Sequence, residues 1–185
     1  FFEDTSNGNV AGPSHRKVVA YYEPQGAGLH GTHTAGTAVG STENGNLIGA
    51  GHAYAARLVH GLDLNVAGFN DTPSTLHAAF VRARNDGATI HTNSWGDDLH
   101  TNYTYWSQDI DRFSWENEDS LVLFASTNGT WVKTPENAKN CLAVVASFQE
   151  PNQDSIFTGG LGPTADGRRK PEIAAPGAGI LSASS

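Results

Sequence analysis

Two histidines stand among small residues in the segment whose chemistry is most easily assigned. Residues 30–36 have the sequence HGTHTAG and include His30 and His33. A histidine at the start of a helix, followed by glycine, can point its imidazole ring into a cleft and act there as a general base. Because the positive end of the helix dipole disfavours the imidazolium, such a base needs a carboxylate beside it. Two other interpretations stay open: a two-histidine metal pair that lacks a third ligand, and ordinary packing histidines.

A second segment, residues 93–96, combines a hydroxyl, an aromatic ring and a glycine at the end of an apolar run. Together, Ser94, Trp95 and Gly96 could form a surface along which an extended peptide lies. The alternative is a turn at the end of a strand with a packed Trp95, and the segment taken alone favours that alternative.

A third segment places an amide directly after a strand-like run. Asn128 follows the apolar residues 121–125 and precedes Gly129. A side-chain amide in this place can donate a hydrogen bond to the oxyanion of an acyl-transfer reaction. By itself, however, the Asn-Gly pair favours a simple turn.

A fourth segment is rich in turn-forming residues. Composition alone predicts that residues 163–177 are an irregular surface loop. Within it, the consecutive basic residues Arg168, Arg169 and Lys170 predict a solvated turn.

The elements that must position these segments alternate between strand and helix. Apolar, β-branched or aromatic runs predict strands at residues 18–22, 53–59, 89–93, 121–125 and 142–146. The spacing of small or apolar residues predicts helices at residues 30–39, at 74–86 and around 106–113. For the second of these helices, Ser74 is the N-cap candidate and Gly87 is the stop.

This alternation predicts an α/β fold, a doubly wound and mainly parallel sheet with helices on both faces. The runs 121–125 and 142–146 are apolar on both faces, which suits strands covered by helices on both sides. In such sheets functional groups gather on loops beyond the carboxyl ends of the strands. We expect His30, Ser94 and Asn128 in that region.

Length and composition exclude several classes of protein. A length of 185 residues favours one domain, residues 1–185, with no second domain. With 11 basic and 19 acidic residues the net charge is −8, which argues against a nucleic-acid partner. No stretch approaches the ~18 apolar residues of a membrane span. The single cysteine, Cys141, excludes an internal disulfide and multi-cysteine metal sites within the chain.

Taken in order, the four segments resemble the subtilisin-like serine proteases, or subtilases. The family motif H-G-T-H-x-A-G is matched by residues 30–36, and the strand end S-W-G by residues 94–96. The family run G-P-T-x-D-G-R-x-K-P-[DE]-[IV]-x-A-P-G-x-x-I-L-S-A is matched almost throughout by residues 162–183. Residues 135–146 also resemble the family pattern P-A-x-A-K-N-x-I-T-V-G-A. The resemblance extends from about residue 17 to the end of the chain.

The resemblance implies a serine endopeptidase that uses an Asp-His-Ser triad. His30 would be the general base, and the other histidine of its motif a structural neighbour. Asn128 would donate a hydrogen bond to the oxyanion. Ser94, Trp95 and Gly96 would border the primary specificity pocket and pair with the substrate backbone.

Two triad members are not found in their family motifs. The family carries its nucleophile in G-T-S-M-A-x-P, which does not occur among the 185 residues. Its aspartate stands in D-T/S-G after an apolar strand, whereas only three residues precede Asp4-Thr5-Ser6. Asp4 is therefore a weak candidate for the triad. We expect a partial domain, incomplete at both ends, that does not hydrolyse peptide bonds by itself.

Two other hypotheses stay open, and departures from the family pattern bear on the first of them. Leu29 and Thr127 each replace a glycine of the family, and residues 157–163 replace F-S-S-R-G-P. The changes at Leu29 and Thr127, together with the missing triad members, motivate a non-catalytic subtilase-like module that binds peptides or partners. A metal-dependent hydrolase would instead need His30 and His33 to bind zinc.

Further expectations follow from the family alone. The expected partners are protein or peptide substrates and the remaining polypeptide of the same domain. No cofactor is required, no metal ligand is assigned, and structural calcium stays an option without ligands. The family also suggests a secreted or secretory-pathway location.

Overall fold

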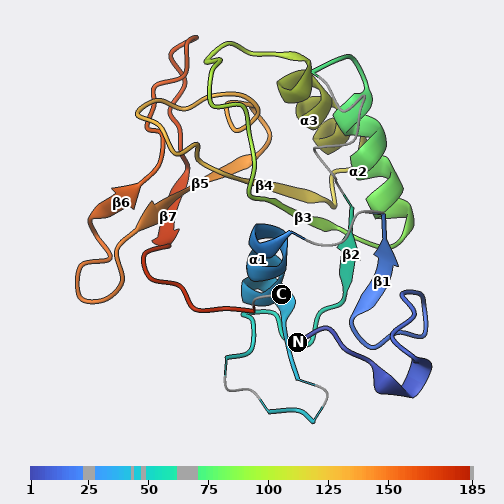
Figure 1. The fold of residues 1–185 in the computed structure, drawn as a ribbon. Helices are drawn as coiled ribbons and strands as arrows, with labels where there is room; N and C mark the ends of the chain where they lie inside the picture. The colour runs from blue at the N-terminus through green and yellow to red at the C-terminus, as the bar shows by residue number, and fades with distance from the viewer. Residues whose placement is uncertain (23–27, 43, 47–48, 62–70, 184–185) are drawn as a thin grey trace. The chain divides into compact units, whose positions relative to one another are not determined.

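The computed structural model describes residues 1–22, 28–42, 44–46, 49–61 and 71–183. The chain falls into two compact units, whose helices and strands are labelled in Figure 1. Unit 1 comprises Phe1–Ala67, Ala83–Ala88 and Ile180–Ser185, and unit 2 comprises Gly68–Arg82 and Thr89–Gly179. The single domain favoured by the length of the chain stays a prediction. Within the described ranges, no helix is long and apolar enough to cross a bilayer.

Strands and helices alternate along most of the chain, and the strands pair mainly in parallel, which confirms the predicted α/β class. The elements are η1 (Thr5–Asn7), β1 (Val18–Tyr21), α1 (Leu29–Val39), β2 (Leu58–His60), α2 (Thr75–Asn85), β3 (Ile90–Asn93), α3 (Tyr105–Glu116), β4 (Leu121–Ala125), β5 (Leu142–Ser147), β6 (Ile156–Thr158) and β7 (Ile173–Pro176).

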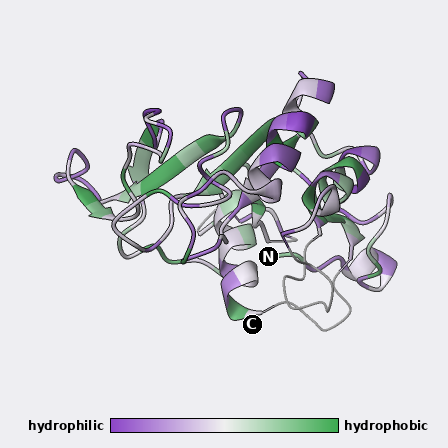
Figure 2. Cartoon of the chain, turned by 90° about the horizontal axis from the view of Figure 1, so that it is seen from above, coloured by the Kyte–Doolittle hydropathy of each residue, from purple (hydrophilic) through white to green (hydrophobic). Residues whose placement is uncertain are grey.

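Unit 2 contains a five-stranded sheet built around β5. The neighbouring pairs β3–β4, β4–β5 and β5–β7 are parallel, and only β6 runs antiparallel to β5. Asn93 pairs with Phe124, so β3 and β4 end at nearly the same level. The strands are among the most hydrophobic segments of the chain (Figure 2). The apolar runs predicted these central strands correctly.

In the core of unit 2, α2 and α3 bury the faces that their sequence periodicity predicted. Leu76 and Ile110 are fully buried, and Phe80 and Phe113 lie with their ring centroids 5.2 Å apart. The ring of His91 from β3 contacts each phenylalanine at a centroid distance of 5.1 Å. The two helices therefore pack through aromatic contacts that favour tilted or edge-on rings.

Burial alternates along the two central strands. In β4, Val122 and Phe124 are fully buried, whereas Leu121 is 44% exposed. In β5, Ala143 and Val145 are buried and the residues between them are half-buried. One face of these strands packs into the core, and the other is buried less deeply than their continuous apolar runs suggest.

The start of α2 is capped differently from the prediction. Ser74 has a φ of 66°, outside the extended conformation of an ordinary N-cap residue. The carboxylate of Asp109, from α3, instead accepts hydrogen bonds from the amides of Leu76 at 3.0 Å and His77 at 3.2 Å. A negative group at this end of the helix also complements the helix dipole. The local cap prediction was wrong because a tertiary contact satisfies these amides.

The predicted stop of α2 is confirmed. Gly87 has a φ of 96°, which glycine adopts at little cost. Its amide donates to the Arg84 carbonyl at 2.8 Å, and the Ala88 amide donates to the Ala83 carbonyl at 3.1 Å. This pair of hydrogen bonds is the Schellman arrangement that ends many helices.

Three local predictions need correction. The predicted strand 53–59 begins only at Leu58, because residues 53–56 form a turn closed by a hydrogen bond from Ala56 to Ala53. Residues 173–176 form β7, within a segment predicted to be loop, because their main chain pairs with β5. The short strand β6 was not predicted.

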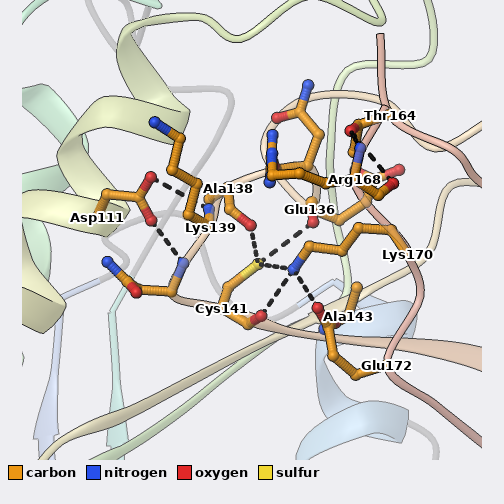
Figure 3. Close-up of polar contacts among 12 residues, drawn as sticks. Asp111, Glu136, Ala138, Lys139, Cys141, Ala143, Thr164, Arg168, Lys170 and Glu172 are labelled. Atoms are coloured by element: carbon orange, nitrogen blue, oxygen red, sulfur yellow. Dashed lines mark hydrogen bonds and ion pairs between the residues drawn. The ribbon is translucent and has the colours of Figure 1, made fainter. Parts of the chain in front are cut away.

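The basic run at residues 168–170 is not wholly solvated (Figure 3). The Lys170 ammonium is buried and donates to the Cys141 carbonyl and pairs with Glu172, each at 2.8 Å. Glu172 in turn accepts a hydrogen bond from the amide of Ala143 at 2.7 Å. The segment before β7 is thereby attached to the start of β5. Burial also raises the pKa of the Cys141 thiol to about 11, so this thiol stays protonated and inert.

In unit 1, β1 and β2 pair in parallel, and α1 packs closely against the segment 180–183. A Cβ atom added at Gly36 would lie 2.6 Å from Ser182 Oγ and 2.8 Å from Ala183 Cβ. The Ser182 hydroxyl donates to the His33 carbonyl at 2.9 Å. Glycine at position 36 is therefore needed for this approach.

We predict that Gly36→Ala lowers the free energy of unfolding by about 1–3 kcal/mol, because the added methyl group overlaps the 180–183 segment. Urea denaturation measures the change. The matched control is Gly31→Ala on the same helix, where the nearest atom would be 3.7 Å away. There we expect no loss and up to about 1 kcal/mol of gain, from helix propensity. Equal effects of the two substitutions would contradict the close approach.

We also predict that Lys170→Met destabilises the protein by about 1–3 kcal/mol, because Glu172 and the Cys141 carbonyl lose their partner. Glu172 is about one-third exposed, and its contact with water limits the loss. The matched control is Arg169→Met, at an exposed neighbouring position. If thermal unfolding gave the same midpoint for both variants, the buried contacts of Lys170 would not contribute to stability.

Candidate active site

His30 is the second residue of α1 in unit 1. The helix begins after Gly28, whose carbonyl accepts the amide of Thr32 at 3.0 Å. The His30 side chain is exposed, and within the described part of the chain it makes no hydrogen bond. The predicted position at a helix start is confirmed, and the role of His30 as a general base stays a prediction.

His33 has a structural role on the same helix. Its Nε2 atom donates to the Ile180 carbonyl at 3.1 Å, so the ring is attached to the 180–183 segment. Among the described residues, no group of three or more histidine, cysteine, aspartate or glutamate side chains is placed to hold a metal ion. The two-histidine metal hypothesis thus gains no third ligand from this part of the chain.

Asp4, the weak candidate for the triad, is buried within the N-terminal loop of unit 1. Its carboxylate accepts hydrogen bonds from the Ser6 hydroxyl at 2.5 Å and the Arg16 amide at 2.7 Å. These bonds hold the pKa of Asp4 below its usual value, and the bond from Ser6 contributes most to this shift. Its contacts stabilise the loop, and none of its hydrogen bonds within the described residues reaches His30.

In unit 2, the strand end that follows β3 is anchored to β4. The Asn93 side-chain amide donates to the Leu123 carbonyl at 3.1 Å and accepts from the Trp95 indole at 3.2 Å. The Trp95 ring packs edge-on against Phe124 and Trp106, at centroid distances of 5.2 and 5.4 Å. The side chain of Trp95 thus has the packing role that the alternative interpretation gave it, and peptide binding by this segment stays a prediction.

Ser94 and Gly96 flank Trp95 and are both exposed. A Cβ atom at Gly96 would lie 3.4 Å from each of three groups: the Thr134 carbonyl oxygen, Pro135 Cδ and Glu136 Oε2. The strand end therefore runs close to the segment 134–136.

Asn128 is exposed in the loop that follows β4. The loop is held by main-chain hydrogen bonds to residues 160–161. The Thr127 carbonyl accepts from the Gly160 amide at 2.6 Å, and Leu161 exchanges bonds with Thr130 and Val132 at 3.0 and 3.2 Å. The side-chain amide of Asn128 therefore lies in a loop whose ends are held by main-chain hydrogen bonds.

Polar contacts join this loop to the strand end. The Thr127 hydroxyl donates to the Asp98 carboxylate at 3.2 Å, and the Lys133 ammonium donates to the Asp98 carbonyl. The Asp97 amide donates to the Thr134 carbonyl at 2.9 Å. The structure thus brings the segment 94–96 together with the Asn128 loop in unit 2, whereas His30 belongs to unit 1.

A further residue of this network was missed from the sequence. Glu136 is fully buried, and its Oε1 atom accepts hydrogen bonds from the amides of Thr127 at 3.1 Å and Lys133 at 2.8 Å. Burial raises the pKa of its carboxyl, although the two amides oppose this shift. The one available signal was a glutamate where the pattern P-A-x-A-K-N has alanine.

Comparison with known proteins settles the family. A model of the subtilase family matches residues 3–185. The chain belongs to the subtilase family. It is thereby a member of a family of serine proteases, which are hydrolases.

Two curated relatives of this subtilase chain are serine proteases by name. It is 29% identical over 168 residues to the serine protease/ABC transporter B family protein tagA of Dictyostelium discoideum, covering 82% of the chain. It is 33% identical over 131 residues to the thermophilic serine proteinase of Bacillus sp. (strain AK1), covering 69% of the chain. The aligned parts make up 9% and 31% of these two proteins.

Solved structures show the same fold. The prenylagaramide maturation protease PagA is similar with a TM-score of 0.67 and 23% identity, over 89% of this chain and 58% of that one. A psychrophilic protease is similar with a TM-score of 0.61 and 22% identity, over 87% of this chain and 55% of that one. The subtilase chain thus spans a little more than half the length of these structures.

The main departure of this subtilase from the family pattern is accommodated locally. Thr127 replaces glycine just before Asn128, and its side chain is bonded to Asp98. The same residue's amide is bonded to Glu136, which itself departs from the pattern. Two departures in the sequence therefore contact each other in the fold.

Proposed function

We propose that the chain supplies the general base and the oxyanion donor of a serine endopeptidase. The observation that carries the proposal is the polar network that holds the segment 94–96 beside the loop of Asn128 in unit 2. A peptide that pairs with the segment 94–96 would have its scissile carbonyl in the region of unit 2 that contains the side-chain amide of Asn128. His30, on α1 in the family's histidine motif, is the residue that supplies the base.

In this proposal each residue has one chemical role. His30 accepts the proton of the nucleophilic serine as it attacks the scissile carbonyl, and then donates that proton to the leaving amine. Asn128 donates a hydrogen bond to the oxyanion of the tetrahedral intermediate, where negative charge develops. The backbone of Ser94, Trp95 and Gly96 pairs with the extended substrate, as a sheet edge does with a peptide.

The triad aspartate and serine are proposed to lie outside residues 1–185. Asp4 is occupied by Ser6 and Arg16, and the family's G-T-S nucleophile motif is absent from the sequence. The 185 residues alone are therefore expected to be inactive. In the full-length gene product, whose flanking sequence would supply the two residues, protein or peptide substrates would be cleaved.

The remaining parts of the proposal rest on the family. We propose a secreted or secretory-pathway enzyme that requires no cofactor, with calcium as an optional structural ion whose ligands are not assigned. No residue of the chain is proposed as a metal ligand.

A second candidate is a non-catalytic module that binds peptides. The replacement of two family glycines by Leu29 and Thr127 favours it, because Leu29 directly precedes His30 and Thr127 directly precedes Asn128. The flanking gene sequence discriminates the two: D-T-G upstream and G-T-S downstream support the protease, and their absence supports the module.

We predict that His30→Ala in the full-length gene product lowers kcat for an unstructured protein substrate by about 10⁴-fold or more, the scale of triad mutations. The matched control is His52→Ala, an exposed histidine of the same unit, with expected wild-type activity. A normal rate in His30→Ala would exclude this residue as the base.

We predict that Asn128→Ala lowers kcat by about 10²–10³-fold with little change in KM, as is typical of an oxyanion donor in a serine protease. Steady-state kinetics on a peptide substrate measures the two constants separately. The control is Asn152→Ala, in an exposed turn. A rise in KM at constant kcat would show that Asn128 binds the substrate without stabilising the oxyanion.

A further inference from the structure

The loop that carries Asn128 is closed by one carboxylate oxygen. Glu136 Oε1 accepts the amide of Thr127, which directly precedes Asn128, and the amide of Lys133, at the far end of the loop. The distances are 3.1 and 2.8 Å. Both ends of the loop thus converge on a single atom.

Burial makes this contact strong. The whole Glu136 residue is 0% exposed, so water does not compete for its oxygen. Hydrogen bonds from amides to a carboxylate are about twice as strong as those between neutral groups. The second oxygen, Oε2, is buried beside Gly96 and has no hydrogen-bond partner among the described residues.

The contacts of Thr127 show why the orientation of Asn128 depends on this carboxylate. The Thr127 carbonyl is fixed by the Gly160 amide at 2.6 Å, and its hydroxyl by Asp98 at 3.2 Å. Its amide is fixed by Glu136 alone among the described residues. Without this acceptor, the peptide group between Ser126 and Thr127 is no longer held in place. The buried amide of Thr127 is then left without a hydrogen-bond partner.

We infer that Glu136 is a positioning residue, which holds the Asn128 amide in the geometry needed for the oxyanion by fixing both ends of its loop. This inference rests on the proposed function of Asn128. Small displacements of a catalytic donor are costly, since a shift of about 1 Å can reduce the rate by about 10²-fold.

Two nearly isosteric substitutions test the role in the full-length gene product. Glu136→Gln retains a side-chain oxygen that can accept both amides, whereas Glu136→Leu fills similar space without an acceptor. We expect Glu136→Leu to lower kcat by about 10–100-fold with KM changed less than about 3-fold, and Glu136→Gln to retain most of kcat. Glu118→Gln, at an exposed carboxylate, is the control. Equal kcat values for the leucine and glutamine variants would overturn the inference.

A double-mutant cycle separates positioning from general stability. In the Asn128→Ala background the positioned group is gone, so Glu136→Leu should lower kcat by less than about 2-fold. If Glu136→Leu costs the same in both backgrounds, Glu136 does not act through Asn128.

Amide hydrogen exchange tests, independently of catalysis, whether Glu136 holds both ends of the Asn128 loop. We expect the amides of Thr127 and Lys133 to exchange at least about 10-fold faster in Glu136→Leu than in Glu136→Gln, because only the glutamine offers an acceptor. Unchanged exchange at both amides would overturn the inference whatever the activity. If the wild-type protein is inactive but shows the expected exchange pattern, the proposed function is refuted. The contact of Glu136 with both ends of the loop is then still supported.

Discussion

Main-chain pairing between the parallel strands β3 and β4 determines where the two loops that follow them begin. Because Asn93 lies opposite Phe124, β3 and β4 end together, and the chain leaves both strands at the same edge of the sheet. The segment 94–96 and the loop of Asn128 are neighbours for this reason. A shift of one residue in this register would turn the side chains of β4 to the opposite face. The fully buried Val122 and Phe124 make that shift costly.

Charged side chains inside unit 2 hold the connections between its helices and strands. Asp109 caps α2 from α3, Lys170 attaches the segment before β7 to β5, and Glu136 closes the loop after β4. Each accepts from or donates to backbone groups that regular secondary structure leaves unsatisfied. A buried charge is tolerated only when it is bonded in this way. These three residues therefore specify the connections between elements more than the elements themselves.

The sequence predicted the elements well and their connections poorly. The runs of β3, β4 and β5 and the spacing of Ile110 and Phe113 are local patterns, so they could be recognised without tertiary information. Asp109 and Lys170 act on residues far away in the sequence, and neither has a local signature. His30 and Asn128 were proposed from their motifs, whereas the departure of Glu136 from its motif did not indicate which amides it contacts.

The contact between α1 and the segment 180–183 has a consequence for biosynthesis. The hydrogen bonds of His33 in that contact join residues 147 and 149 positions apart in the chain. Contacts between such distant residues are slow to form, because a long loop must close first. The helix that carries His30 therefore completes its packing only after residues 180–183 have been synthesised. Until then the surface of α1 around Gly36 is uncovered in a nascent chain, where chaperones and other chains can contact it.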